Sequence, residues 1–292
     1  WKLQNNSGKS SPGKCAKEVP GFQKHAIAAD VEAEAAGLEE ERLLARLDHR
    51  RFAAPGNELQ HLVGDFVSHK IVVVFRENLA QVEERILRAC QSCGRKREEI
   101  TLIGVSKVFP GEAIVEAYEA GLREFGENYV QEFEGKHPAV KHLADARFHL
   151  IGHLQSNKSR KAGELFQVIQ TVDSPKLARR LNEVGKPLDV MIEVKLSEEE
   201  AKAGIGPEGV PGLLDEIGGC PHLRLLGLMT MPPWDDDAEK SRPYFRRLRE
   251  LAARHSLAGL SMGMSHDFEV AIEEGATHIR VGTALFGKRQ RP

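Results

Sequence analysis

The sequence predicts an α/β fold: one (β/α)8 barrel of the TIM type preceded by an N-terminal extension. Short apolar segments typical of buried strands recur eight times across residues 75–292. A helical segment lies between nearly every pair of them, and a glycine is often positioned to end that helix. Strands that alternate with helices in this way pair in parallel through right-handed crossovers, and eight such units close a barrel. An open, doubly wound sheet is the alternative architecture.

The expected strands share a short apolar core bounded by turn residues. They cover residues 101–106, 123–126, 147–151, 167–172, 188–194, 223–229, 259–262 and 278–282. A helix that begins near residue 75 comes before them, with Leu79, Val82, Ile86 and Leu87 on one face. We therefore expect the barrel to occupy residues 75–292.

Residues 1–74 differ from the rest of the chain. They open with a Ser/Gly/Asn-rich stretch, which favours disorder, and contain one amphipathic helix candidate at 29–50. Residue 1 is Trp, as expected of a fragment or an over-extended reading frame. Because of this composition and the single helix candidate, we expect a poorly ordered or partly helical extension. No chemical motif lies in this part of the chain.

Composition excludes several classes of function. Lys and Arg number 41 against 43 Asp and Glu, so the chain lacks the excess of positive charge that nucleic-acid binding favours. No apolar run is long enough to span a bilayer, and the N-terminus lacks the apolar region of a signal peptide. Four scattered cysteines are too few for a disulfide framework. We expect a cytoplasmic protein that binds neither nucleic acid nor membrane.

Lys107 follows the first expected strand, and Pro110 comes three residues later. Side chains alternate along a strand, so Ile103, Val105 and Lys107 share the inward face. The C-terminal ends of barrel strands carry the chemistry of these folds. A partly desolvated amine there is able to attack an aldehyde. The alternative is a lysine that extends to solvent.

The last expected strand runs into a turn suited to a phosphate. Gly282 and Thr283 follow it, and backbone N–H groups at such a turn bind anions in many barrels. The preceding strand ends in a segment that adds the hydroxyls of Ser261 and Ser265. Each cluster by itself is typical of an ordinary turn. Lys107 opposite a phosphate turn predicts a site for pyridoxal 5'-phosphate (PLP).

Arg280 is expected to point into the barrel two residues before Gly282. A buried guanidinium needs an acceptor, and a structural salt bridge is one explanation. The functional alternative sets it against the pyridine nitrogen of PLP. Arginine does not protonate that nitrogen, so the ring would remain a weak electron sink.

Other polar residues at strand ends admit simpler explanations. Asn128 is suited either to bind a cofactor or to cap the following helix. His149 and His153 are four residues apart, which favours a metal site on a helix but not on a strand. Cys90 and Cys93 have no second pair nearby. We expect no metal site.

Together these segments resemble the YggS/PROSC family of PLP-binding, PLP-homeostasis proteins. The resemblance covers about residues 75–289 and rests on six motifs in order: Val105-Ser-Lys107, Phe125-Gly-Glu-Asn-Tyr129, His149-x-Ile-Gly-x-Leu-Gln-Ser-Asn-Lys158, Gly227-Leu-Met229, Leu260-Ser-Met-Gly-Met-Ser265 and Ile279-Arg-Val-Gly-Thr283. His153, often proline in the family, and the loop at 230–234 depart from the pattern, and the extension is foreign to it.

The resemblance implies a monomeric or weakly associating barrel like the N-terminal domain of bacterial alanine racemase. It implies a Schiff base on Lys107, with Arg280 at the pyridine nitrogen. The remaining implied contacts are the phosphate ligands Ser265, Gly282 and Thr283 and the pocket residues Asn128 and Met229. The implied role is to hold PLP, deliver it to apo PLP-dependent enzymes and keep vitamin B6 and amino-acid pools balanced, without catalytic turnover.

A PLP-dependent amino-acid racemase of the same barrel type is the rival function. Racemisation needs a base on each face of the substrate α-carbon, and Lys107 is able to serve only one face. The resemblance implies that the opposing tyrosine would come from a separate C-terminal β-domain, which the residues after Thr283 are too few to form. Of the three tyrosines, only Tyr129 follows a strand end. We therefore favour the carrier over the racemase.

Overall fold

The computed structural model describes residues 56–197 and 203–287, with side chains described from residue 74 onward. The helix candidate at 29–50 lies outside these ranges. The chain forms two compact units, Trp1–Val67 and Ser68–Pro292. The second unit contains the whole of the barrel.

Eight parallel strands form a closed barrel in which each strand pairs with the next along the chain and β8 pairs with β1. They are β1 (Thr101–Val105), β2 (Glu124–Glu127), β3 (Arg147–Leu150), β4 (Val168–Val172), β5 (Leu188–Glu193), β6 (Leu223–Met229), β7 (Gly259–Met264) and β8 (His278–Val281). The prediction of a (β/α)8 barrel is confirmed, with strand ends that differ by no more than two residues from those expected. The open sheet is excluded because β8 closes onto β1.

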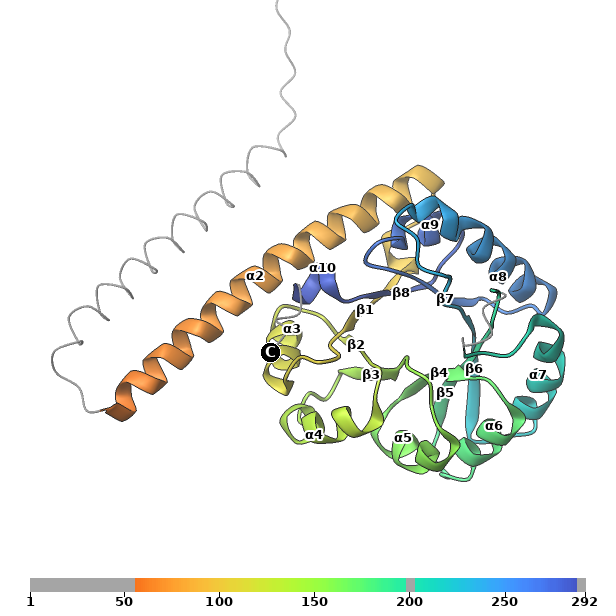
Figure 1. Cartoon of the computed structure of the whole chain (residues 1–292), viewed down its shortest axis with the longest axis horizontal. Helices are drawn as coiled ribbons and strands as arrows, with labels where there is room; N and C mark the ends of the chain where they lie inside the picture. The colour runs from red at the N-terminus through yellow and green to blue at the C-terminus, as the bar shows by residue number, and fades with distance from the viewer. Residues whose placement is uncertain (1–55, 198–202, 288–292) are drawn as a thin grey trace, which may run out of the picture. The chain divides into compact units, whose positions relative to one another are not determined.

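Helices surround the strands, as Figure 1 shows. They are α2 (Gly56–Cys93), α3 (Gly111–Glu119), α4 (Val130–Val140), α5 (Ser159–Leu165), α6 (Pro175–Asn182), α7 (Val210–Gly218), α8 (Arg242–Arg254), α9 (Phe268–Glu273) and α10 (Thr283–Phe286). Short 3-10 turns cover Arg97–Glu99, Ser156–Lys158, Pro207–Gly209 and Ala238–Ser241. No helix among the described residues is long and apolar enough to cross a membrane.

α2 begins upstream of the start expected near residue 75, since neither proline nor glycine interrupts the chain between Gly64 and its end at Cys93. On its expected inner face, Val82 and Ile86 are buried, whereas Leu87 is exposed. Successive residues on a helix point about 100° apart, so Leu87 turns away from the face that Ile86 presents to the barrel.

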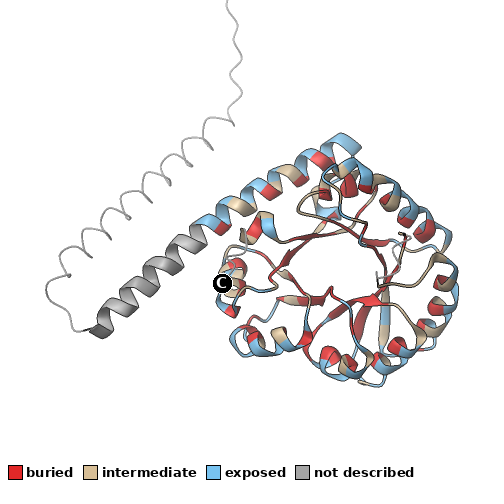
Figure 2. Ribbon diagram, in the orientation of Figure 1, coloured by how far each residue is buried: buried red, intermediate tan, exposed pale blue. Residues whose placement is uncertain are grey.

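The core lies between the strands and the surrounding helices, as the burial colours of Figure 2 show. An aromatic cluster illustrates how it is built. Phe133 of α4 packs against Phe148 of β3 and against Phe166, with ring centroids 4.7 Å apart in each pair. Phe125 of β2 stacks on Phe148 at 5.7 Å. This packing holds α4 against β2 and β3.

Candidate functional site

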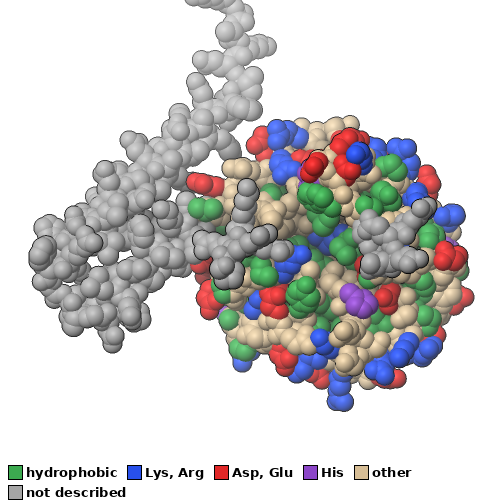
Figure 3. All heavy atoms as spheres, viewed as in Figure 1, with side chains coloured by type: hydrophobic (Ala, Val, Ile, Leu, Met, Phe, Trp, Pro, Cys, Tyr) green, Lys and Arg blue, Asp and Glu red, His purple; other side chains and the backbone are tan. Residues whose placement is uncertain are grey.

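A cavity of about 1030 Å³ opens at the C-terminal ends of the strands. We call it the main cavity. Its lining residues come from the ends of β1, β7 and β8 and from the segments that follow β1, β2, β3, β6, β7 and β8. The spheres of Figure 3 show hydrophobic and basic side chains around the centre of this face. The volume is close to the upper end of the range for sites that hold small molecules and cofactors.

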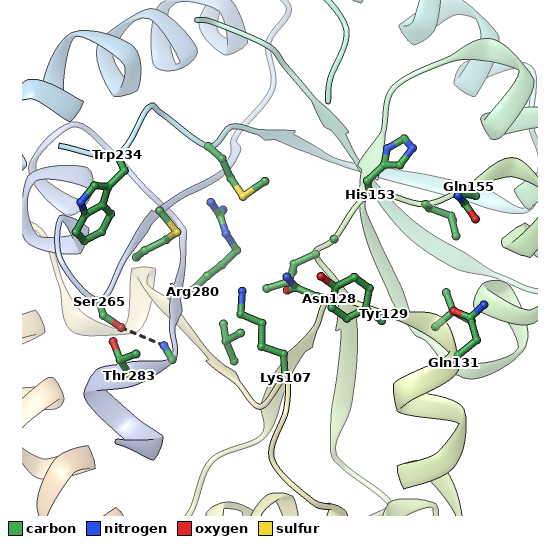
Figure 4. Close-up of a pocket in the computed structure, with 18 of the residues that line it drawn as sticks. Lys107, Asn128, Tyr129, Gln131, His153, Gln155, Trp234, Ser265, Arg280 and Thr283 are labelled. Atoms are coloured by element: carbon green, nitrogen blue, oxygen red, sulfur yellow. Dashed lines mark hydrogen bonds between the residues drawn. The ribbon is translucent and has the colours of Figure 1, made fainter. Parts of the chain in front are cut away.

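Lys107 lies in the turn directly after β1 and lines the main cavity. The turn is fixed on both sides. The Ser106 N–H donates to the Gly126 carbonyl at 3.0 Å, and the Phe109 N–H donates to the Ser106 carbonyl at 3.1 Å. The Lys107 side chain points toward the centre of the cavity, on the side where Arg280 also points (Figure 4). The structure thus brings the two predicted cations into one site.

A buried ion pair supports the turn that carries Lys107. The Lys136 ammonium of α4 lies 2.9 Å from Glu127 Oε1 and 2.6 Å from Glu132 Oε1, and it donates to the Ser106 carbonyl at 2.9 Å. Glu132 also accepts from the Val108 N–H at 2.5 Å. Val108 has a φ of 65°, in the left-handed region that a β-branched residue rarely adopts. These contacts stabilise that unusual turn.

Ser265, Gly282 and Thr283 meet at the other side of the main cavity. The Ser265 hydroxyl accepts from the Gly282 N–H at 3.1 Å and from the Ala284 N–H at 3.4 Å (Figure 4 draws the first of these). Because those bonds use its lone pairs, the hydroxyl proton remains available to a ligand. With the Thr283 hydroxyl, the arrangement offers hydrogen-bond donors toward an anion.

Arg280 lies at the base of the main cavity and is 3% exposed. Its guanidinium donates to the Ser261 hydroxyl at 2.6 Å and to the Thr230 carbonyl at 2.9 Å. Burial lowers the pKa of Arg280 to about 10, while Asp267 and Glu193 oppose that shift. The group therefore stays charged at neutral pH. Its described contacts are to a hydroxyl and a carbonyl, and not to the carboxylate partner of a salt bridge that the sequence left open.

Behind Arg280, a chain of polar side chains runs through the barrel interior. Ser261 donates to Gln170 Oε1 at 2.6 Å, and Gln170 Nε2 lies 2.9 Å from His149 Nδ1. His149 Nε2 in turn lies 2.5 Å from Glu124 Oε2. Gln170 Nε2 is a donor, so His149 accepts at Nδ1 and carries its proton at Nε2. The chain therefore links the cation at the cavity base to a carboxylate at the opposite end of the barrel.

Asn128 also lines the main cavity, from the loop after β2. The next loop passes very close to it. A Cβ atom added at Gly152 would lie 2.2 Å from the Asn128 carbonyl oxygen. Only glycine allows this approach, so Gly152 sets the position of Asn128.

Six of the eight predicted site residues line the main cavity: Lys107, Asn128, Ser265, Arg280, Gly282 and Thr283. Met229 and Ser261 are fully buried and are not among the lining residues. Ser261 lies within β7, where its hydroxyl accepts from the Arg280 guanidinium, whereas Ser265 follows the end of that strand. The methionines that do line the cavity are Met231 and Met264.

Sequence reasoning missed part of the lining, chiefly Gln131, Gln155, Met231, Trp234, Met264 and His266. Tyr129 is 60% exposed and Trp234 is 69% exposed, and both line the cavity. A signal for Tyr129 was its position after a strand end. Trp234 lies in the 230–234 loop, and nothing in its local sequence indicates that this loop returns to the cavity.

The two histidines spaced four apart have separate surroundings. β3 ends at Leu150, so His149 is buried in the interior chain while His153 is exposed in the following loop, with Nδ1 3.7 Å from Asp173. Among the described residues, no group of three or more His, Cys, Asp or Glu side chains is arranged to hold a metal ion.

The family comparisons agree with this geometry. The family described as Alanine racemase, N-terminal domain, matches residues 78–290. The pyridoxal phosphate homeostasis protein of Aquifex aeolicus is 45% identical over 224 residues, which is 73% of this chain and 98% of that protein. The homeostasis protein of Escherichia coli K12 is 41% identical over 229 residues, covering 73% of this chain and 95% of the other.

Solved structures are similar as well. PipY of Synechococcus elongatus, solved with PLP bound, is 39% identical with a TM-score of 0.65, covering 73% of this chain and all of PipY. Alanine racemase of Clostridium difficile 630 is 15% identical with a TM-score of 0.58, covering 75% of this chain and 57% of that enzyme, and this shows the fold alone. The chain belongs to the alanine racemase N-terminal-domain family and, within it, to the pyridoxal phosphate homeostasis proteins.

Proposed function

We propose that this chain binds PLP in the main cavity and acts as an intracellular carrier of the cofactor. One observation carries the proposal: an amine, a set of anion donors and a buried guanidinium line the same cavity from β1, β7 and β8. When bound, PLP supplies an aldehyde that condenses with amines and a ring that withdraws electrons. The donor types and the size of the cavity fit such a molecule.

Each side chain has a separate task in this proposal. Lys107 is the nucleophile for the aldehyde carbon. Ser265 and Thr283 donate hydrogen bonds to the phosphate, and charge-assisted bonds of this kind are about twice as strong as neutral ones. Gly282 contacts the phosphate at the turn, and its N–H donates to the Ser265 hydroxyl and so orients it. Arg280 faces the pyridine nitrogen and Asn128 contacts the ring substituents. Met229 and Ser261, which do not line the cavity, act from beneath it, Ser261 by holding Arg280.

The chemistry of Arg280 favours a carrier over an enzyme. Its guanidinium keeps its charge at neutral pH, so it is able to donate a hydrogen bond to a ring nitrogen but does not transfer a proton to it. A ring that stays unprotonated stabilises a carbanion poorly. We therefore propose that the protein holds PLP, releases it to apo PLP-dependent enzymes and so balances vitamin B6 and amino-acid pools.

We further propose that the protein is monomeric and acts in the cytoplasm. The described cysteines, Cys90, Cys93 and Cys220, are free thiols, as expected in a reducing compartment. Sedimentation or light scattering of the purified protein tests the first statement. Fractionation of cells that produce the protein tests the second.

The test of the cofactor site is chemical labelling. The PLP-loaded protein is reduced with borohydride and its peptides are mapped. We expect the pyridoxyl group on Lys107 in the wild type. Lys158 also lines the main cavity and gives a matched control, because Lys158→Ala should leave the label on Lys107. A label confined to Lys158 or to other lysines contradicts the assignment.

The test of carrier against racemase follows α-protons. The PLP-loaded protein is incubated with L-alanine and other L-amino acids in deuterated water, and proton exchange and chirality are measured over time. We expect exchange far below an enzymatic rate, since a missing general base typically lowers a rate by about 10²–10⁴-fold. The same preparation should activate an apo PLP-dependent enzyme. Rapid inversion that disappears in Lys107→Ala would favour the racemase.

A further inference from the structure

A second cavity, of about 500 Å³, lies beside the main cavity and shares Met231, Trp234 and Met264 with it. We call it the side cavity. Most of its walls are apolar, formed by Val194, Leu196, Ala203, Pro232 and the three shared side chains. Its polar lining residues are Glu193, Lys195 and Ser197. The proposed cofactor contacts use none of these polar groups.

Glu193 is the last residue of β5 and is only 3% exposed. Its Oε2 atom is buried and has no hydrogen-bond partner. No side chain in residues 74–197 and 203–287 forms an ion pair with the Glu193 carboxylate. A buried carboxylate without a partner is costly, because removal from water is not offset by a nearby charge. The side cavity thus contains a buried carboxylate that forms no ion pair with the described residues.

The charges around Glu193 favour a bound cation. Burial raises the pKa of Glu193 to about 7, and Asp173, after β4, raises it further, whereas Arg280 of β8 lowers it. Arg280 already donates to Ser261 and Thr230. A cation near Glu193 would offset both carboxylates. A metal ion is a poor candidate because no group of three metal-ligating side chains is present among the described residues.

We propose that the side cavity binds a primary ammonium group that carries a short apolar chain, with Glu193 as its counter-ion. The ammonium donates to the Glu193 carboxylate, and the apolar chain packs against the methionine, proline and tryptophan side chains. Free amines and amino acids both present this chemistry. A ligand bound in the side cavity is next to the main cavity, where we propose that PLP binds. Binding of the amine does not require PLP to be present.

The experiment uses the full chain freed of PLP, so that no aldehyde is present to capture the amine. Isopentylamine, leucine and isopentanol are titrated by ligand-observed NMR. At pH 8 we expect isopentylamine or leucine to bind at least about tenfold more tightly than the alcohol, as a charge-assisted hydrogen bond predicts. The tighter of the two amines identifies whether the source is a free amine or an amino acid.

Two further arms test the role of Glu193. Glu193→Gln should abolish the preference for the amine, whereas Glu250→Gln, an exposed control on α8, should retain it. In the wild type, amine affinity should fall roughly tenfold from pH 8 to pH 6, because protonation removes the charge of Glu193 while the amine stays charged. Alcohol binding should not change.

The proposal is overturned if amine and alcohol bind alike, if neither binds, if amine affinity is independent of pH, or if a folded Glu193→Gln retains the preference. The wild-type pH and alcohol arms decide the matter even if Glu193→Gln fails to fold. The labelling of Lys107 by PLP is read in a separate experiment, so failure of the carrier proposal is distinguishable from failure of this one.

Discussion

At the scale of single residues, Arg280 connects the main cavity to the barrel interior. Its guanidinium is held by Ser261 and the Thr230 carbonyl, and Ser261 is held by Gln170. In the series of hydrogen bonds from Arg280 to Glu124, each residue donates to the next one toward Glu124. Each side chain therefore has one orientation that satisfies both of its neighbours. The orientation of Arg280 is therefore fixed before any ligand binds.

Ser261 and Ser265 belong to one sequence motif but should respond differently to substitution. Ser261→Ala leaves buried groups of Arg280 and Gln170 unpaired, so we expect the free energy of unfolding to fall by about 1–3 kcal/mol. Ser265→Ala removes the acceptor of the Gly282 and Ala284 N–H groups, so we expect a loss of about 1 kcal/mol. It should also weaken PLP far more than pyridoxal, which lacks the phosphate. Urea denaturation and titration with both vitamers measure these effects. Equal loss of PLP and pyridoxal in Ser265→Ala would contradict the phosphate assignment.

Two histidines, His149 buried and His278 partly buried, should make the fold sensitive to mild acid. Burial lowers the pKa of His278 to about 4 and also lowers the pKa of His149. Below the usual histidine pKa of 6.5 the unfolded chain binds protons that the folded chain excludes, so stability is full above pH 6.5 and falls as the pH falls toward 4. Each histidine contributes up to about 1.4 kcal/mol per pH unit.

Urea denaturation from pH 7 to pH 4.5 measures this slope. His278→Gln should reduce it, whereas His142→Gln, at an exposed position, should not. A slope that His278→Gln leaves unchanged would assign the acid sensitivity to other groups.

At the scale of elements, α4 supports the turn after β1. Lys136 contacts Glu127, Glu132 and the Ser106 carbonyl, so one ammonium joins a helix, a strand end and the turn that carries Lys107. Burial raises the pKa of Glu127, whereas its contacts with Lys136 and Ser106 lower that pKa. The conformation of the turn that carries Lys107 thus depends on a helix residue that does not itself line the cavity.

Lys136→Met should destabilise the fold by about 3–5 kcal/mol, because it leaves the fully buried Glu127 without its counter-ion. It should also slow the labelling of Lys107 by PLP. The double variant Lys136→Met with Glu127→Gln should lose less stability than the single variant, since the unpaired charge is gone. Lys141→Met, exposed next to the end of the same helix, is the control. Thermal unfolding that does not distinguish Lys136→Met from this control would contradict the role of the pair.

At the scale of the whole molecule, the site forms where the barrel closes. Lys107 follows β1, and Arg280, Gly282 and Thr283 come from β8 or the residues after it, so the proposed cofactor contacts come from both ends of the barrel sequence. They meet because β1 pairs with β8, with Ile103 opposite Arg280. PLP binding therefore requires a closed barrel.

A chain that begins at Val74 should fold and bind PLP as the full chain does, since every proposed contact lies beyond that residue. This tests the expected domain boundary between residues 74 and 75. A chain that begins at Gln81 lacks Phe75, whose ring lies 5.1 Å from that of Phe286, and Asn78, which donates to the Leu285 carbonyl at 2.9 Å. It should lose about 3–5 kcal/mol. Melting temperature and PLP titration compare the three chains. A large loss in the Val74 chain would show that earlier residues stabilise the barrel.

The sequence by itself determined the order of strands and helices and the strand ends that carry Lys107, Asn128, Ser265 and Gly282. These are local properties, because apolar periodicity, glycine positions and inward alternation are set within a few residues. Arg280 was also predicted to point inward, and the structure confirms it.

Only the tertiary structure decided which candidates reach the cavity. The pairing of β7 with β8 shifts register between Ser261 and Met264, and Gly263 has a φ of 91°, so a count along the strand does not give the depth of each serine. Met229 is buried one layer below Met231. The carboxylate of Glu193, the polar chain behind Arg280 and the support from Lys136 all join residues distant in sequence. Their contacts depend on where separate strands end against one another, which barrel closure and core packing determine.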